Sequence, residues 1–141
     1  MSRFSDEFRA GYARLADYLI PAYNGKPAAS AVGVHRSMLD EVMRIRPDLE
    51  AGFRRAVEAC SGKGVSESLN ALARSDAAAF GALTTVTTGG YMMTDEARAA
   101  VGYPGQDAAP FDANAVPEYV TKGMLDRVIQ RGPIFRDTKG L

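Results

Sequence analysis

Few side chains in this sequence have the chemistry of an acid, a base or a nucleophile. His35 is the single histidine, and Cys60 is the single cysteine. As a general base, His35 would need a nucleophile or an orienting acid beside it, and Asp40, five residues further on, does not share a helical face with it. Cys60 lies on an apolar helical stripe, where a thiol behaves as a small hydrophobe. We therefore expect structural roles for both residues.

The sequence lacks motifs for cofactors, metals and nucleic acids. Its glycines form neither a dinucleotide fingerprint nor a phosphate loop. Basic and acidic residues number 17 each, so the net charge is zero, and no basic stripe of the kind that binds nucleic acid is visible. No apolar run approaches the ~18–20 residues of a membrane span. We expect no cofactor in this chain, no nucleic-acid partner and no direct membrane insertion.

Two clusters place a tyrosine beside flexible or kinked backbone. One reads Gly-Gly-Tyr-Met-Met-Thr over residues 89–94, and the other reads Gly-Tyr-Pro-Gly-Gln over residues 102–106. A tyrosine beside such a loop is a frequent anchor of a protein interface, but it can equally pack across a turn of its own domain. Composition leaves both alternatives open for Tyr91 and Tyr103.

The spacing of apolar residues predicts an all-α protein, a single domain of residues 1–141 with six or seven short helices. A stripe that includes Phe8, Tyr12 and Leu15 predicts the first helix, behind an N-cap at Ser5. Turn-forming residues predict irregular connections at 22–33 and 103–116 and an extended tail at 133–141.

Apolar faces also predict the later helices. Ser66 is expected to cap the fourth helix. A second helix is expected from Ser37, with Met38, Val42 and Ile45 facing inward. A last helix is expected from about Pro117 to Gly132, with Val120, Met124 and Val128 facing inward.

Residues 77–93 admit two interpretations. Phe80, Leu83, Thr87 and Tyr91 fit one helical face. The β-branched run over 84–88, followed by two glycines, also fits a hairpin with a Gly-Gly turn. We favour the helix, in which paired glycines indicate the close approach of another backbone.

Taken together, the two tyrosine clusters resemble motifs of the gluconate 2-dehydrogenase subunit 3 family. The first cluster reads Gly-Tyr-Met-Met-Thr-Asp over 90–95, with Met92 where many members have a second tyrosine. The second reads Gly-Tyr-Pro-Gly over 102–105. Upstream, Leu-Ala-Asp-Tyr-Leu-Ile-Pro over 15–21 is similar to the family's early Leu-Ala-x-x-(Ile/Leu)-Ile-Pro segment. The order and approximate spacing are preserved over most of the chain.

This resemblance implies an all-helical small subunit without catalytic residues of its own. It would bind a large subunit of the glucose–methanol–choline (GMC) oxidoreductase type, which holds FAD and acts on sugars, glycosides or related alcohols. Hydride transfer would take place in that partner, and the small subunit would stabilise or chaperone it. The resemblance leaves open whether a cytochrome c subunit also joins the complex.

The partner contacts that we expect from the resemblance come from both tyrosine clusters and from the tail. They are Tyr91, Met92, Tyr103, Pro104, Gly105 and Phe135. Many family members begin with a twin-arginine signal that is missing here, so a cytoplasmic complex is expected, or a periplasmic one if the partner carries an export signal. Two alternatives belong to other classes: a stand-alone helical lyase or isomerase that uses His35, and a homo-oligomeric helical binding module.

Overall fold

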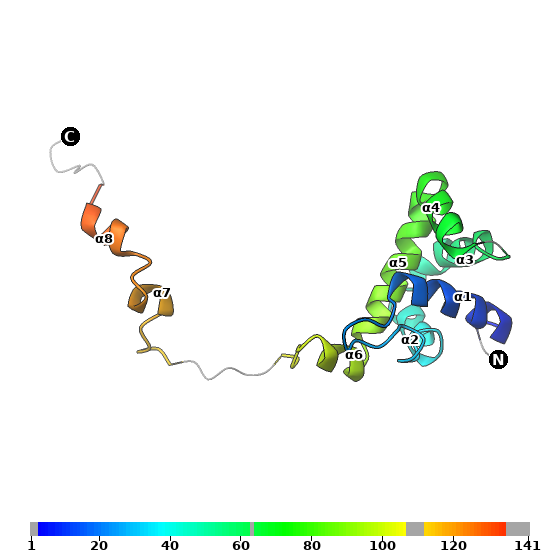
Figure 1. The fold of residues 1–141 in the computed structure, drawn as a ribbon, viewed down its shortest axis with the longest axis horizontal. Coiled ribbons are helices and arrows are strands. Elements are labelled where there is room, and N and C mark those ends of the chain that lie inside the picture. The colour runs from blue at the N-terminus through cyan, green and yellow to red at the C-terminus, as the bar shows by residue number, and fades with distance from the viewer. Residues whose placement is uncertain (1–2, 63, 107–111, 135–141) are drawn as a thin grey trace. The chain divides into compact units, whose positions relative to one another are not determined.

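The computed structural model describes residues 3–62, 64–106 and 112–134 (Figure 1). Within these residues the regular elements are eight α-helices and one 3₁₀ helix, beside one isolated β-bridge between Tyr23 and Lys26. The prediction of an all-α protein is confirmed. The chain divides into two compact units, Met1–Gln106 and Asp107–Leu141, which are described separately. We call the first the helical unit.

Helix α1 (Asp6–Leu19) opens the helical unit much as the sequence predicts. The Ser5 hydroxyl accepts a hydrogen bond from the Phe8 amide at 3.2 Å, so this residue is the expected N-cap. Tyr12, Leu15 and Ala16 are buried along the inward face. The amphipathic stripe therefore places α1 on the core through the residues that its periodicity singles out.

An aromatic cluster joins α1 to α3 (Glu50–Ala59), which follows the 3₁₀ helix η1 (Pro47–Leu49). Phe53 of α3 is fully buried. Its ring centroid lies 4.8 Å from that of Tyr12, 5.8 Å from that of Phe8 and 6.0 Å from that of Phe4, with steeply inclined planes throughout. Such edge-to-face pairs stabilise a core beyond the apolar area that they bury.

Helix α5 (Ala77–Met92) is the central element of the helical unit, and it contacts α1, α2 (Ser37–Ile45), α3 and α4 (Val65–Ser75) (Figure 1). The favoured helical interpretation of this segment is confirmed. Asp76 caps the helix by accepting a hydrogen bond from the Ala79 amide at 2.9 Å. The Thr87 hydroxyl donates to the Leu83 carbonyl at 2.8 Å. Capping and packing on four neighbours outweigh the strand preference of its threonines.

Two details of the predicted helices are wrong. In α2 the buried residues are Leu39, Val42 and Met43, whereas Ile45 is 51% exposed. Ile45 comes six residues after Leu39, which turns it well away from the buried face. Helix α4 begins at Val65 behind an extended Gly64, so Ser66 lies inside the first turn and is not its cap.

The second unit contains α7 (Glu118–Thr121) and α8 (Asp126–Arg131). The prediction of a single helix from Pro117 is wrong, because Gly123 adopts a φ of +69° and ends α7. The amides of Gly123 and Met124 donate to the carbonyls of Val120 and Tyr119, which is a Schellman termination. The residues that were expected to face inward are all exposed, namely Val120, Met124 and Val128.

Candidate functional site

The first tyrosine cluster divides between the core and the surface. Tyr91 is only 5% exposed, and its hydroxyl donates to the carbonyl of Pro27 at 2.8 Å. This bond ties the irregular connection 22–33 to the C-terminal end of α5. Of the two roles open to Tyr91, the structure favours packing across a turn of its own unit over direct contact with a partner. Met92 and Met93, which follow it, are each more than one-third exposed.

Gly90 accounts for the tight packing beneath this cluster. A Cβ atom at this position would lie 3.5 Å from Val34 and 3.6 Å from both Met38 and Val42, so nothing larger than a methyl group would fit without displacement. These three atoms belong to side chains, so the expected close approach of another backbone is not found at Gly90. Gly89, in contrast, faces open space.

The second tyrosine cluster follows α6 (Asp95–Ala100). Thr94 caps this helix, accepting from the Ala97 amide at 3.3 Å. Gly102, with a φ of +71°, ends it: its amide donates to Ala99 and the amide of Tyr103 donates to Arg98, at 3.0 and 2.9 Å. These hydrogen bonds hold the backbone of Tyr103 in a fixed position at the end of α6.

Tyr103 and Pro104 are the exposed residues of the second cluster. The Tyr103 side chain is 49% exposed, Pro104 is exposed as well, and Gly105 is half-buried. Gly105 adopts a φ of +93°, a conformation that favours glycine. Phe135, the remaining predicted contact, lies outside the described residues.

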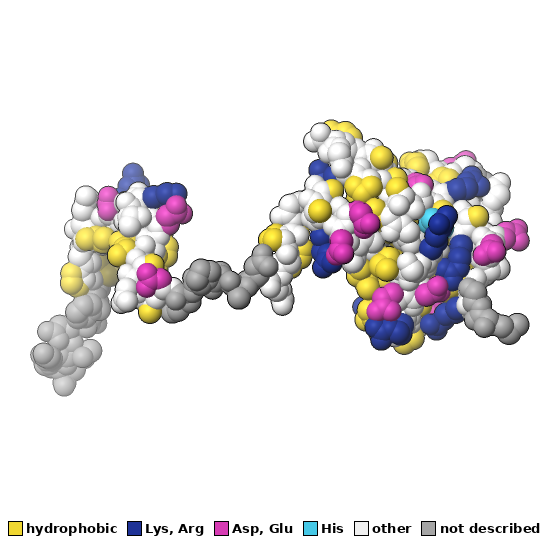
Figure 2. All heavy atoms as spheres, turned by 90° about the horizontal axis from the view of Figure 1, so that it is seen from below, with side chains coloured by type: hydrophobic (Ala, Val, Ile, Leu, Met, Phe, Trp, Pro, Cys, Tyr) yellow, Lys and Arg dark blue, Asp and Glu magenta, His cyan; other side chains and the backbone are white. Residues whose placement is uncertain are grey.

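An apolar groove lies between α2 and α5. It has a volume of about 210 Å³. Ile45 and Met93 contribute exposed apolar side chains to it. Helix α5 carries no charged residue, so its contribution to the surface is uncharged, and Figure 2 shows apolar side chains gathered in patches between charged ones on the face of the helical unit in view. The lining residues are Val42, Ile45, Arg46, Leu49, Thr85, Gly89 and Met93.

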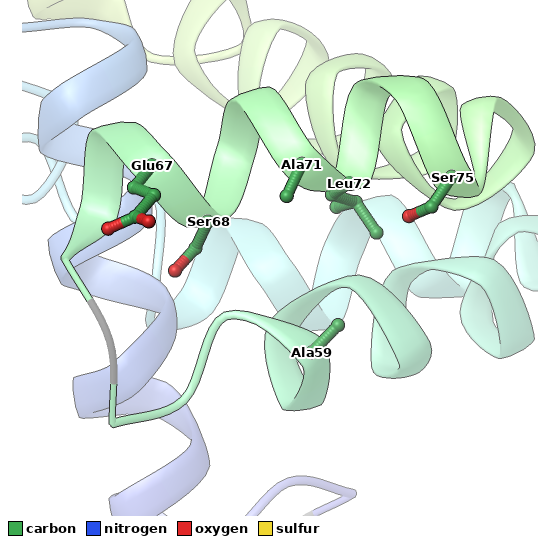
Figure 3. A pocket seen from close by; sticks show the side chains of 6 residues that line it. All are labelled: Ala59, Glu67, Ser68, Ala71, Leu72 and Ser75. Atoms are coloured by element: carbon green, nitrogen blue, oxygen red, sulfur yellow. The ribbon is translucent and has the colours of Figure 1, made fainter.

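A second hollow, of about 390 Å³, lies between α3 and α4 (Figure 3). Ser68 and Leu72 lie on the side of α4 that faces Ala59, and Glu67 and Ser75 are at the margin. Ser68 is 6% exposed, and its hydroxyl has no hydrogen-bond partner among the residues that the structure describes. The sequence marks Ser68 only by its position four residues before the apolar Leu72, on the same helical face.

His35 stands at the junction that leads into α2. Its Nε2 accepts a hydrogen bond from Nε of Arg36 at 3.2 Å. Burial and the neighbouring Arg36 guanidinium hold the pKa of His35 below its usual value. Asp40 bonds Arg9, at 2.7 Å, and Arg9 also donates to the backbone carbonyl of His35 at 3.2 Å. These contacts suit a residue that fixes a junction, and that role stays a prediction.

Cys60 also fits its expected structural role, since it is buried at the end of α3. Among the described residues, no three His, Cys, Asp or Glu side chains are grouped closely enough to hold a metal ion. None of the described helices is both long and apolar enough to span a membrane. No protein-family model, no curated protein and no solved structure matches this chain.

Proposed function

We propose that this chain is the small accessory subunit of a GMC-type flavoprotein dehydrogenase or oxidase that acts on sugars, glycosides or related alcohols. The motif resemblance suggests this function. One observation about the surface carries it: the exposed motif residues Met92, Tyr103 and Pro104 come from the end of α5 and the loop after α6. Met93, the neighbour of Met92, lines the apolar groove beside the uncharged helix α5. Surfaces of this kind are typical of protein interfaces.

Each residue of this surface has a definite part in the proposal. Tyr103 and Pro104 are direct contacts, presented by the cap at Gly102. Met92 and Met93 add flexible apolar side chains that adapt to a partner. Complete burial of a large apolar side chain contributes about 1.5–3 kcal/mol, so side chains that are one-third to one-half exposed retain about 1 kcal/mol each for binding. Tyr91 supports the surface from inside.

The chemistry of the complex belongs to the partner subunit. FAD bound there would accept hydride from a substrate hydroxyl. This chain contributes buried interface, which stabilises the folded partner by mass action.

The contact surface can be tested with a matched pair of tyrosine variants. Tyr103→Ala should weaken binding to the co-expressed flavoprotein about fivefold, since about 1 kcal/mol of its burial remains for binding. Tyr18→Ala serves as the control, because Tyr18 on α1 is 52% exposed, almost the same as Tyr103. Dissociation constants from surface plasmon resonance would decide. Equal affinity for the two variants would exclude Tyr103 from the interface.

A further inference from the structure

The residues 112–134 expose apolar side chains without forming a core. None of the residues in α7 or α8 is buried. The exposed fractions of the large apolar side chains run from 39% to 72%. They belong to Val116, Tyr119, Val120, Met124, Val128, Ile129 and Ile134.

Neither helix of this segment is long enough to be stable unaided. Helix α7 has four residues and α8 has six, whereas isolated helices shorter than about 12–15 residues are marginal in water. Gly123 and Gly132 end them, with φ of +69° and +71°. Because these breaks prevent one continuous helix, two copies of the segment have no long seam along which to form a coiled coil. The helices therefore need a surface that covers their apolar residues.

The charges of the segment indicate what kind of surface this is. Acidic and basic residues are three each, and Glu118 pairs with Lys122 at 2.8 Å. A helix that binds anionic lipid or nucleic acid carries an excess of Lys and Arg on its polar face. In this segment basic residues do not outnumber acidic ones. Alternating charges around apolar side chains fit a protein surface with an apolar groove and a mixed polar rim.

The length of the segment also fits a protein partner. A stable protein interface of standard size involves about 20–30 residues on each side. Residues 112–134 supply 23 residues, which is enough for such an interface without any contribution from the helical unit.

We propose that residues 112–134 are a binding arm that folds onto a groove of a protein partner. Resting on the proposed function, that partner is the flavin-containing catalytic subunit. The arm is a second attachment, separate in sequence from Met92 and Tyr103. Two linked attachments hold a partner more tightly than either alone, because the second binding event becomes intramolecular.

Two full-length variants test the arm. Val120→Asp with Val128→Asp places charge on its apolar residues, and Thr121→Asp with Gln130→Asp places the same charge on exposed polar positions of the same helices. Each variant and the wild type would be tagged and co-expressed with the neighbouring genes of its source genome. The visible absorbance of flavin that co-elutes on size exclusion is the readout. We expect at least a tenfold loss for the valine variant and retention for the control.

The outcomes distinguish a failure of the binding-arm proposal from a failure of the proposed function. If the wild type retains flavoprotein and the valine variant retains as much, the arm is refuted while the proposed function stands. If the wild type retains none, the proposed function fails, and the assignment of the arm's partner fails with it. A dimer of the purified chain that the valine variant converts to a monomer would show that the occupant is a second copy, which also refutes the inference.

Hydrogen exchange on the unmutated protein gives a test that does not depend on how the variants fold. In the free chain the amides of α7 and α8 should exchange without protection, and in the complex they should be protected at least tenfold. Amides of α5 should be protected in both samples and serve as the internal control. Protection of α7 and α8 in the free chain, or its absence in the complex, would overturn the proposal.

Discussion

Tyr12 and Thr87 share one buried hydrogen bond, yet removing either partner should have unequal consequences. The two oxygens are 3.1 Å apart, and the residues are 0% and 1% exposed. The Thr87 hydroxyl already donates to the Leu83 carbonyl at 2.8 Å, so Tyr12 must be the donor in the shared bond. Tyr12→Phe removes that donor, and the Thr87 hydrogen stays paired. Thr87→Val leaves the Tyr12 hydroxyl buried without an acceptor.

The expected free energies of unfolding follow from this asymmetry. Tyr12→Phe should cost about 0.5–1.5 kcal/mol, and Thr87→Val should cost about 1–3 kcal/mol because it strands a buried hydroxyl. In the Thr87→Val background, Tyr12→Phe removes the stranded group and should therefore be neutral or stabilising. Urea denaturation followed by circular dichroism measures these free energies for wild type, the two single variants and the double variant, which together form a double-mutant cycle. Additive effects of the two substitutions would refute this description of the core.

Three further predictions concern stability. Gly52→Val should lower the free energy of unfolding by about 1–3 kcal/mol in urea denaturation, because a Cβ atom there would lie 3.0 Å from the Cβ of Ala82. Gly81→Val is the control, since nothing lies within 4 Å of a Cβ atom there, and equal costs of the two substitutions would contradict the packing of α3 on α5. The pKa of His35 is lower in the folded than in the unfolded chain, so below about pH 6.5 the unfolded chain binds the proton more readily. Wild type should therefore lose more stability than His35→Gln between about pH 7 and 5, and parallel pH profiles of the two proteins would contradict this. Burial raises the pKa of Tyr12, so stability should fall as the pH rises above about 10 in wild type, and less steeply in Tyr12→Phe; equal slopes would exclude this cause.

The sequence was sufficient where local signals and packing agree. Ser5 caps the helix that it was expected to cap. For the central helix, the β-branched residues opposed the periodicity. The helix forms because Asp76 caps it and because four other helices bury its inward face. That outcome depends on tertiary contacts, which no local window contains.

The errors arise where one residue changes the path of the backbone or where the partner of a side chain is distant in sequence. Gly123 divides the last predicted helix, although the apolar spacing continues through it. The direction of Tyr91 is decided by the carbonyl of Pro27, 64 residues earlier. Exposure of Met92, Tyr103 and Pro104 agrees with the predicted contact surface, but their contact with a partner stays a prediction.

In the proposed function, this chain binds a larger flavin-containing subunit. The most direct measurement is size-exclusion chromatography of the tagged full-length chain, co-expressed with the neighbouring genes of its source genome, with the flavin absorbance recorded across the elution. We expect a yellow complex that contains this chain and one larger polypeptide. A well-folded, colourless species that contains only this chain would contradict it.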